Sequence, residues 1–220
     1  MKKYFEILEK CPLFSGIDMK DISVMLGCLG ARVESFDKKY TIFAEGKPAK
    51  YIGIVLSGSA QVISNDYYGN RSILQSADPS DLIGEAFACA DVNAIPVSVI
   101  ANEPCEVMFI ECKRILHSCS NACGFHAQMI FNLMKDLAKK NIMFHDRIEI
   151  TSKRSTREKL LAYLMSRARI ANNASFDIPF DRQELADYLE VDRSGLSAEI
   201  GKMKKEGIID CRKNHFELMI

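Results

Sequence analysis

Hydrophobic positions along the chain follow a short period first and a longer one later. Between residues 31 and 111, runs rich in Val, Ile and Leu alternate with turn residues: YIGIVLSG (51–58), SAQVISN (59–65), RSILQSA (71–77) and EVMFIE (106–111). Apolar runs of this length between turn residues are typical of antiparallel strands. Turns are expected at four glycines, Gly46, Gly58, Gly69 and Gly84. The pattern predicts a small antiparallel β-roll.

A heptad pattern follows the strands. Between residues 121 and 150, small and apolar residues recur at alternating spacings of four and three: Cys123, Ala127, Ile130, Met134, Leu137, Asn141, Phe144 and Ile148. This spacing is typical of a coiled-coil seam. A single seam Asn pairs best with the same amide of an identical helix, so Asn141 favours a parallel dimer. The alternative is one long helix packed on its own domain. In either case a second stripe is expected to face the β-roll: Met129, Leu133, Asp136 and Lys140.

The last third of the chain restarts a helix and then predicts a pair of short helices. Ser155 or Thr156 is suited to cap the first of these helices after a hinge at 151–155. An apolar skeleton then joins two short helices through the turn 189–192: Leu185, Ala186, Leu189, Val191, Leu196 and Ile200. Asp192 is a suitable N-cap for the second of the pair. This is a helix-turn-helix pattern, and GIID with HFEL predicts a two-stranded wing behind it.

The second helix of this pair begins with small and polar exposed residues, which suit the major groove of DNA. Arg193 can donate two hydrogen bonds to a guanine edge, and Ser194 and Ser197 can reach phosphates or bases. Lys202 on the helix, with Arg212 and Lys213 at the wing tip, is expected near the phosphate backbone. The sequence therefore predicts a DNA-reading surface.

Composition narrows the class of protein. The chain has 220 residues, 48% hydrophobic and 26% charged, with a formal net charge of zero, which predicts a soluble globular protein of two domains. It shows neither a signal peptide nor an apolar run of the ~18 residues that a membrane span needs, so a cytoplasmic location is expected. No His falls within the strand region, and no Ser-His-Asp order or phosphate-binding loop appears, so an enzyme is not expected.

The eight cysteines are scattered without any CxxC pair, so neither a zinc ribbon nor a thioredoxin-like site is indicated. Most are expected to be reduced thiols that pack as small apolar residues. CKRILHSCSNACGFH places Cys119, Cys123 and His126 at helical spacing, which leaves a metal-sensing or thiol-redox site as an alternative.

The order β-roll, long helix and winged helix-turn-helix resembles the Crp/Fnr family of bacterial transcription factors, named after the catabolite activator and the fumarate-nitrate regulator. PLFSGI, GSAQV, LIGEAF and RQELADYLEVDRSGLSAEIGKMKKEGII carry the resemblance. It implies an α+β fold: a cyclic-nucleotide-binding-like jelly roll (1–120), a coiled-coil dimerisation helix (121–150) and a winged helix-turn-helix DNA-binding domain (151–220). The implied partners are palindromic double-stranded DNA, a second copy of the chain and RNA polymerase.

The family's DNA-contacting positions transfer unevenly. Arg193 matches its first recognition-helix Arg, and Arg182 with Gln183 matches the phosphate-contacting residues that open the preceding helix. Ser194 and Ala198 stand where the catabolite activator has Glu and Arg, and Glu190 replaces the turn glycine. A different operator sequence is therefore expected.

The resemblance also implies a small effector in the roll, near Gly84, Glu85, Ala86, Pro96, Val97, Met129 and Leu133. Gly84-Glu85 matches the pair that holds the ribose of a cyclic nucleotide. The Arg-Ser pair that neutralises the phosphate is replaced by Ile95-Pro96, and Asp136 stands in place of another nucleotide-contacting Arg. A buried phosphate would lack a counter-charge there, so cyclic AMP is disfavoured. An iron–sulfur cluster is disfavoured as well, because Cys11 and Cys28 do not reproduce the N-terminal cysteine cluster.

A rival hypothesis is a ligand-binding regulatory module that acts on a protein partner. Such a module would share the roll and the dimer helix but would have no need of Arg193 or a basic wing tip. We expect a dimeric transcription regulator controlled by an effector other than cyclic AMP.

Overall fold

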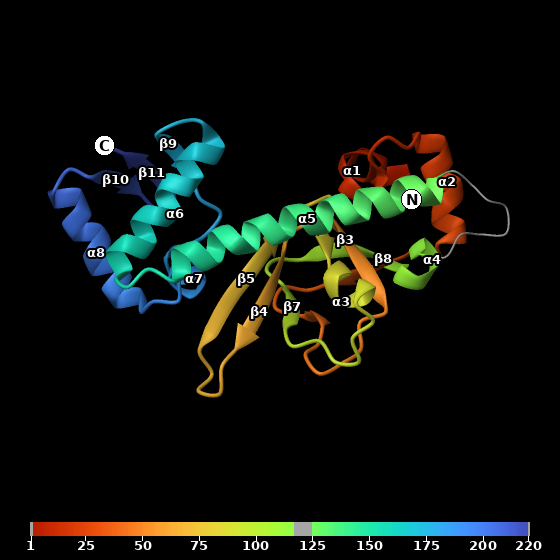
Figure 1. The fold of residues 1–220 in the computed structure, drawn as a ribbon, viewed down its shortest axis with the longest axis horizontal. Helices are drawn as coiled ribbons and strands as arrows, with labels where there is room; N and C mark the ends of the chain where they lie inside the picture. The colour runs from red at the N-terminus through yellow and green to blue at the C-terminus, as the bar shows by residue number, and fades with distance from the viewer. Residues whose placement is uncertain (1, 117–124, 220) are drawn as a thin grey trace. The chain divides into compact units, whose positions relative to one another are not determined.

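A computed structural model describes residues 2–116 and 125–219 (Figure 1). It divides into two compact units. The roll unit comprises the residues up to Asn70 together with Leu74–Asn141. The C-terminal unit comprises Arg71–Ile73 and the chain from Ile142 onward.

The roll consists of two four-stranded sheets, which confirms the predicted antiparallel β domain. One sheet has the order β1-β8-β3-β6: β1 is Arg32–Phe36, β8 Cys105–Glu111, β3 Tyr51–Ser57 and β6 Leu82–Ile83. The other has the order β2-β7-β4-β5: β2 is Thr41–Phe43, β7 Ser98–Ala101, β4 Ala60–Asn65 and β5 Arg71–Ala77. All four predicted apolar runs lie in these strands, and β3 and β8 pair along most of their length.

The four predicted turn glycines all have positive φ, which only glycine adopts without strain. Gly58 shows why a side chain is excluded: a Cβ there would lie 2.2 Å from the carbonyl oxygen of Pro104. The tight connection between β3 and β4 therefore depends on this residue.

Short helices close one side of the roll around a core shared with α5. They are η1 (Lys2–Tyr4), α1 (Phe5–Lys10), η2 (Pro12–Phe14), α2 (Met19–Cys28), α3 (Glu85–Cys89) and α4 (Cys112–Leu116). Leu8, Phe14 and Leu26 from these helices join one buried cluster with Ile52 of β3 and Met129 of α5. The cluster fixes the N-terminal half of α5 against the roll.

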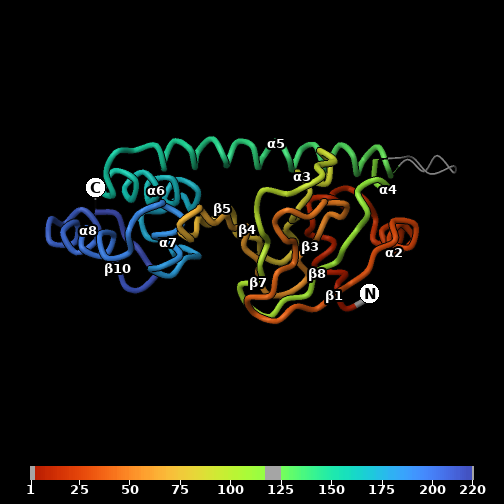
Figure 2. Tube along the Cα trace, turned by 90° about the horizontal axis from the view of Figure 1, so that it is seen from below, coloured from red at the N-terminus to blue at the C-terminus, as the bar shows by residue number. Residues whose placement is uncertain are grey.

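Helix α5 (Phe125–Thr151) has the two faces that the heptad pattern predicts. Met129, Leu133 and Asp136 are buried, which confirms the stripe expected to face the roll. Figure 2 shows α3 beside the N-terminal half of α5. The seam face is largely exposed: Met134 is 59% and Ile148 62% exposed. None of the described helices is long and apolar enough to cross a membrane.

The C-terminal unit contains α6 (Thr156–Ala171), β9 (Ser175–Asp177), α7 (Arg182–Leu189), α8 (Arg193–Lys205), β10 (Ile209–Arg212) and β11 (His215–Leu218). Ser155 caps α6 in a capping box with Glu158, which confirms one of the two predicted caps. The strands form the sheet β10-β11-β9, so the predicted two-stranded wing has a third strand behind it. The core between helices and sheet contains Leu164, Leu185, Leu196, Met203 and Phe216.

Candidate functional site

Helices α7 and α8 form the predicted helix-turn-helix. Glu190 ends α7 in the left-handed conformation, with φ of 54°, the backbone geometry for which a glycine would be the usual choice. Asp192 caps α8, as predicted, by accepting a hydrogen bond of 2.7 Å from the amide of Gly195. Hydrogen bonds from the Ser194 hydroxyl and from that amide hold the pKa of Asp192 below its usual value. The charged cap therefore fixes where α8 begins.

The two faces of α8 differ as a DNA-reading helix requires. Leu196, Ile200 and Met203 are buried against the core of the C-terminal unit. The residues predicted to contact DNA lie on the other face and are all exposed: Arg193, Ser194, Ser197 and Lys202. The Ser194 hydroxyl donates to the Asp192 carboxylate, and Lys202 Nζ lies 3.6 Å from Glu199 Oε2. Arg193 stands at the helix N-terminus among small side chains, where a base edge could approach it.

The wing and the start of α7 are brought together by Arg182. Its Nη2 donates to the carbonyl oxygen of Lys213 at 3.3 Å, and its guanidinium lies 5.6 Å from the centre of the Phe216 ring. Arg212 and Lys213 at the wing tip are exposed. Gln183 is exposed as well and donates to Asp187 Oδ1 at 2.8 Å. Arg182 thus holds the wing tip in place while its own side chain is half-buried.

Arg147 of α5 is a contact that the sequence reasoning missed. Its side chain is buried, and its guanidinium lies 4.9 Å from the centre of the Tyr188 ring of α7. Nη2 lies 3.5 Å from both the Tyr188 carbonyl oxygen and Glu190 Oε1. Burial lowers the pKa of Arg147, while Tyr188 and Glu190 oppose that shift. The end of α5 is therefore bonded directly to the turn of the helix-turn-helix.

One of the predicted effector residues, Glu85, belongs to a buried group of charges. Glu85, at the start of α3, accepts a hydrogen bond of 2.7 Å from Lys140 Nζ of α5. Lys140 also donates to the carbonyl oxygen of Leu82 at 2.8 Å and lies 3.3 Å from Asp136 Oδ2. The side chains of Glu85, Asp136 and Lys140 are only 5%, 9% and 13% exposed. We refer to these three residues as the ion cluster.

The remaining predicted effector residues fall into buried and exposed sets. Val97, Met129 and Leu133 are buried, whereas Ala86 and Pro96 are exposed and Gly84 is half-buried. The Phe43 ring lies against Gly84, so that a Cβ on Gly84 would be 3.1 Å from two of its atoms. Burial raises the pKa of neighbouring Asp81, a shift that Lys140 opposes and Asp136 reinforces. Side chains and charges of the chain itself therefore crowd this region.

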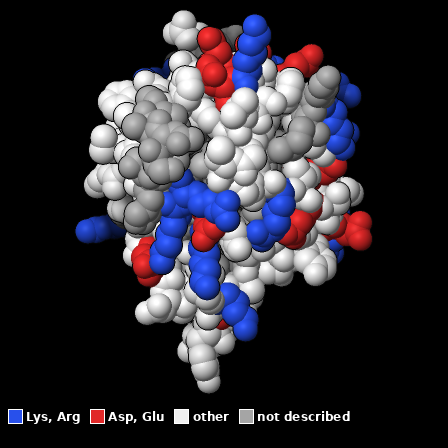
Figure 3. Space-filling view, turned by 90° about the vertical axis from the view of Figure 1, so that its right-hand side faces the viewer, with Lys and Arg blue, Asp and Glu red and all other residues white. Residues whose placement is uncertain are grey.

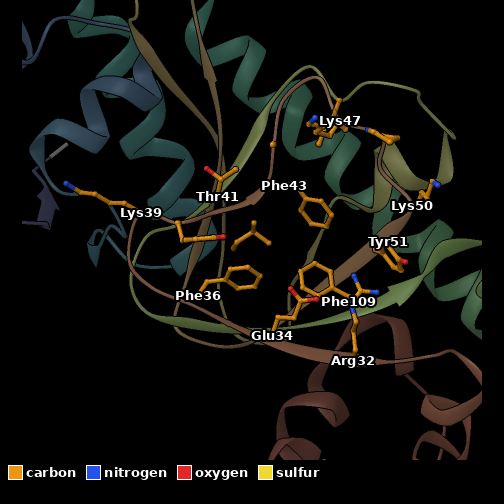
Figure 4. A pocket seen from close by; sticks show the side chains of 15 residues that line it. Arg32, Glu34, Phe36, Lys39, Thr41, Phe43, Lys47, Lys50, Tyr51 and Phe109 are labelled. Carbon is orange, nitrogen blue, oxygen red and sulfur yellow. Dashed lines mark hydrogen bonds and ion pairs between the residues drawn. The ribbon is translucent and has the colours of Figure 1, made fainter.

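A hollow of about 690 Å³ opens on the roll between the edge strands β1 and β2, and Ile95 is among the residues that line it. Phe36, Phe43 and Phe109 line it, with the Phe109 ring centre 6.1 Å from that of Phe36 and 5.7 Å from that of Phe43. Figure 4 shows these rings turned toward the shared space. Four basic residues stand around them, Arg32, Lys39, Lys47 and Lys50, beside the acidic Glu34.

The surface charge of the roll unit is mixed. Figure 3 looks onto the part that carries α1, α2 and α4, and it shows Lys and Arg side chains gathered near the middle with acidic side chains interspersed. The net charge of zero therefore conceals local positive groups.

The alternative metal-sensing or thiol-redox site falls mostly outside the described residues, because Cys119 and Cys123 lie in 117–124. His126 is buried, with Nε2 3.2 Å from the carbonyl oxygen of Arg114. Within residues 2–116 and 125–219, no group of three or more His, Cys, Asp or Glu side chains is arranged to hold a metal ion.

Comparison with known families gives two matches that together cover most of the chain. A cyclic nucleotide-binding domain matches residues 33–121, and a Crp-like helix-turn-helix domain matches residues 158–220. The chain belongs to the Crp/Fnr family.

Two curated relatives match this chain over different lengths. The CRP-like cAMP-activated global transcriptional regulator of Mycobacterium tuberculosis is 30% identical over 80 residues, which are 36% of this chain and 35% of that protein. The transcriptional activatory protein AadR of Rhodopseudomonas palustris is 24% identical over 186 residues, 79% of this chain and 72% of that protein. The chain thus spans about a third of the mycobacterial regulator that it matches.

A solved structure has the same fold. The c-di-GMP responsive global regulator CLP of Xanthomonas campestris aligns with a TM-score of 0.74 over 92% of this chain and 100% of its own, at 16% identity. At this identity the likeness concerns the fold alone.

Removal of the lysine should show what the ion cluster contributes to stability. We expect Lys140→Met to lower the free energy of unfolding of the roll unit by about 3 kcal/mol, because Glu85 and Asp136 lose their buried counter-charge. Urea unfolding monitored by circular dichroism measures this. Lys139→Met, one residue away on the exposed side of α5, is the matched control and should change stability by less than about 0.5 kcal/mol.

Neutralisation of a carboxylate should then rescue the variant. Lys140→Met combined with Glu85→Gln is expected to recover part of the lost stability, because one uncompensated buried charge is gone. Equal stabilities of the Lys140→Met and Lys139→Met proteins would show that the ion cluster carries no such energy.

Proposed function

We propose that this protein is a homodimeric, sequence-specific DNA-binding transcription regulator, and that a small effector other than cyclic AMP, bound in the roll, sets its operator affinity. The observation that carries the proposal is the exposed polar face of α8, which begins at Arg193. The basic wing tip, Arg212 and Lys213, follows this helix in the sequence. Membership of the Crp/Fnr family supports the same function.

The proposal that the protein reads DNA rests on three different roles of its basic residues: base contact, phosphate contact and positioning of the wing. Arg193 is exposed at the N-terminus of α8, where a guanidinium can donate two hydrogen bonds to a guanine. Lys202, Arg212 and Lys213 are also exposed and suit phosphate oxygens. Arg182 is bonded to the wing instead, so we assign it a positioning role with a secondary part in phosphate contact.

The homodimer rests on the uncovered seam of α5. Large apolar side chains at seam positions are exposed to solvent in the single chain: Ile130, Met134, Phe144 and Ile148. Leu137 is partly buried, and Asn141 is exposed between the apolar residues. A second α5 would bury this face and let the two Asn141 amides bond to each other. Two recognition helices would then address the two halves of a palindromic operator.

The exclusion of cyclic AMP rests on charge. Ile95, where the resemblance expects a phosphate-binding Arg, is 3% exposed and offers no counter-charge. Lys140 is already bonded to Glu85, the residue that would hold the ribose, and Asp136 would repel a phosphate. The hollow between β1 and β2 supports an effector of another kind, because it provides ligand-sized space with aromatic walls and a basic rim.

Action on a protein partner is the rival function. The two functions differ in the salt dependence of duplex binding, because a protein that contacts several phosphates releases counterions on binding. For a DNA reader, the logarithm of the association constant falls linearly with the logarithm of salt concentration. A flat salt response without preference among duplexes would favour the protein partner.

Arg193→Ala tests the reading of bases. The variant should bind the duplex that the parent protein enriches from a random pool more weakly by roughly 10- to 100-fold for each half-site, because each subunit loses one bidentate base contact. Its affinity for random duplex should change little. Fluorescence anisotropy on both duplexes gives the ratio. Arg169→Ala, on the exposed surface of α6, serves as the control, and unchanged selectivity in the Arg193 variant would remove this residue from the readout.

Met134→Glu tests the dimer. A carboxylate at this seam position would be buried twice in a two-fold interface, so the variant should sediment as a monomer where the parent protein sediments as a dimer. Operator affinity should fall with it, because the two half-sites would be bound independently. Lys139→Glu, on the opposite side of the seam, introduces the same group and should remain dimeric. A dimeric Met134 variant would contradict the assigned interface.

A further inference from the structure

We propose that Cys89 and Cys112 are a reversible disulfide site in the roll unit. The site is independent of DNA reading and of any effector, since it follows from a pair of thiols that neither role uses. Cys89 ends α3, and Cys112 begins α4 directly after β8.

The two sulfur atoms are already in contact. Their Sγ atoms lie 3.6 Å apart, and one thiol can donate its proton to the other sulfur. A disulfide requires about 2.05 Å between sulfurs, so a small approach of two short helix ends is sufficient. α3 and α4 pack against each other in the same unit. Side-chain rotation with slight backbone adjustment can therefore form the bond.

The pair also differs chemically from the other buried cysteines. The hydrogen bond from Cys112 lowers the pKa of Cys89, and the same bond together with burial raises the pKa of Cys112. Burial instead raises the pKa of Cys11 to about 12. Cys89 is half-buried, so a small oxidant can reach it. Cys89 is therefore the attacking thiolate of the pair, and Cys112 is the resolving thiol.

The reaction balances with hydrogen peroxide as the oxidant. The Cys89 thiolate attacks one peroxide oxygen, the O–O bond breaks, and Cys89 sulfenic acid forms while the second oxygen leaves as hydroxide and takes up a proton as water. The Cys112 sulfur then displaces the sulfenic oxygen, forms the S–S bond and releases a second water. Two thiols lose two electrons and two protons, and one peroxide becomes two waters. A dithiol reductant reverses the bond by exchange.

The location gives the disulfide a route to the ion cluster. α3 has five residues, with Glu85 at its first position and Cys89 at its last. A bond that ties its end to α4 therefore restrains the helix whose other end holds Lys140 of α5. The redox state of the pair thereby acts on α3, whose first residue is bonded to α5.

Peptide mapping of the full-length protein tests the site. Reduced protein is treated with one to a few equivalents of hydrogen peroxide, remaining thiols are blocked with N-ethylmaleimide, and the chain is cleaved after Glu, Asp and Lys. These cuts separate peptide 86–91, with Cys89, from the dipeptide Cys112-Lys113, and Cys105 falls in a third peptide, 92–106, because the bond between Glu103 and Pro104 resists cleavage. We expect the first two peptides joined at a mass two hydrogens below their sum, and released by dithiothreitol.

Single substitutions identify the roles. Cys112→Ser should leave Cys89 as a sulfenic acid that dimedone labels, and Cys89→Ser should leave Cys112 as an unreacted thiol. Cys28→Ser, which removes an exposed cysteine outside the pair, should not change the cross-link. The proposal is overturned if Cys89 and Cys112 stay fully alkylated while Cys28 oxidises, or if Cys89 is found joined to another cysteine.

Discussion

The buried bonds of Lys140 with Glu85 and Asp136 are the interaction that links helix α3 to helix α5 in the roll unit. A lysine, a glutamate and an aspartate that are each almost out of solvent are stable only as a group, because a buried charge without its partner costs several kcal/mol. Lys140 and Asp136 belong to α5, and Glu85 belongs to α3. A displacement of α3 relative to α5 must therefore either carry the ion cluster with it or break its bonds.

Helix α5 combines three functions at different positions along its length. Met129 and Leu133 anchor it in the core of the roll unit, and the seam from Ile130 to Ile148 presents an exposed apolar face. Two turns beyond Lys140, Arg147 packs on Tyr188 and bonds to the turn that precedes α8. Helix α5 thus takes part in the ion cluster within the roll unit and, through Arg147, in the packing of the helix-turn-helix within the C-terminal unit.

Features with a local sequence signal were predictable, and features made by distant pairs were not. The four glycines marked turns because their conformation is local, and Ser155 and Asp192 marked helix starts for the same reason. The heptad pattern also showed that Lys140 faces the roll. Its partner Glu85 lies 55 positions away, so only the fold reveals the bond. Cys89 with Cys112, Arg147 with Tyr188, and the hollow between two edge strands belong to the same class of long-range arrangement.

The proposal that the effector is not cyclic AMP is tested most directly by calorimetric titration of the reduced protein with cyclic AMP. We expect no saturable heat up to about 1 mM ligand, because Ile95 supplies no counter-charge and the Asp136 carboxylate would repel the phosphate. Saturable binding of one nucleotide per chain at micromolar concentration, abolished by Glu85→Gln, would contradict the account.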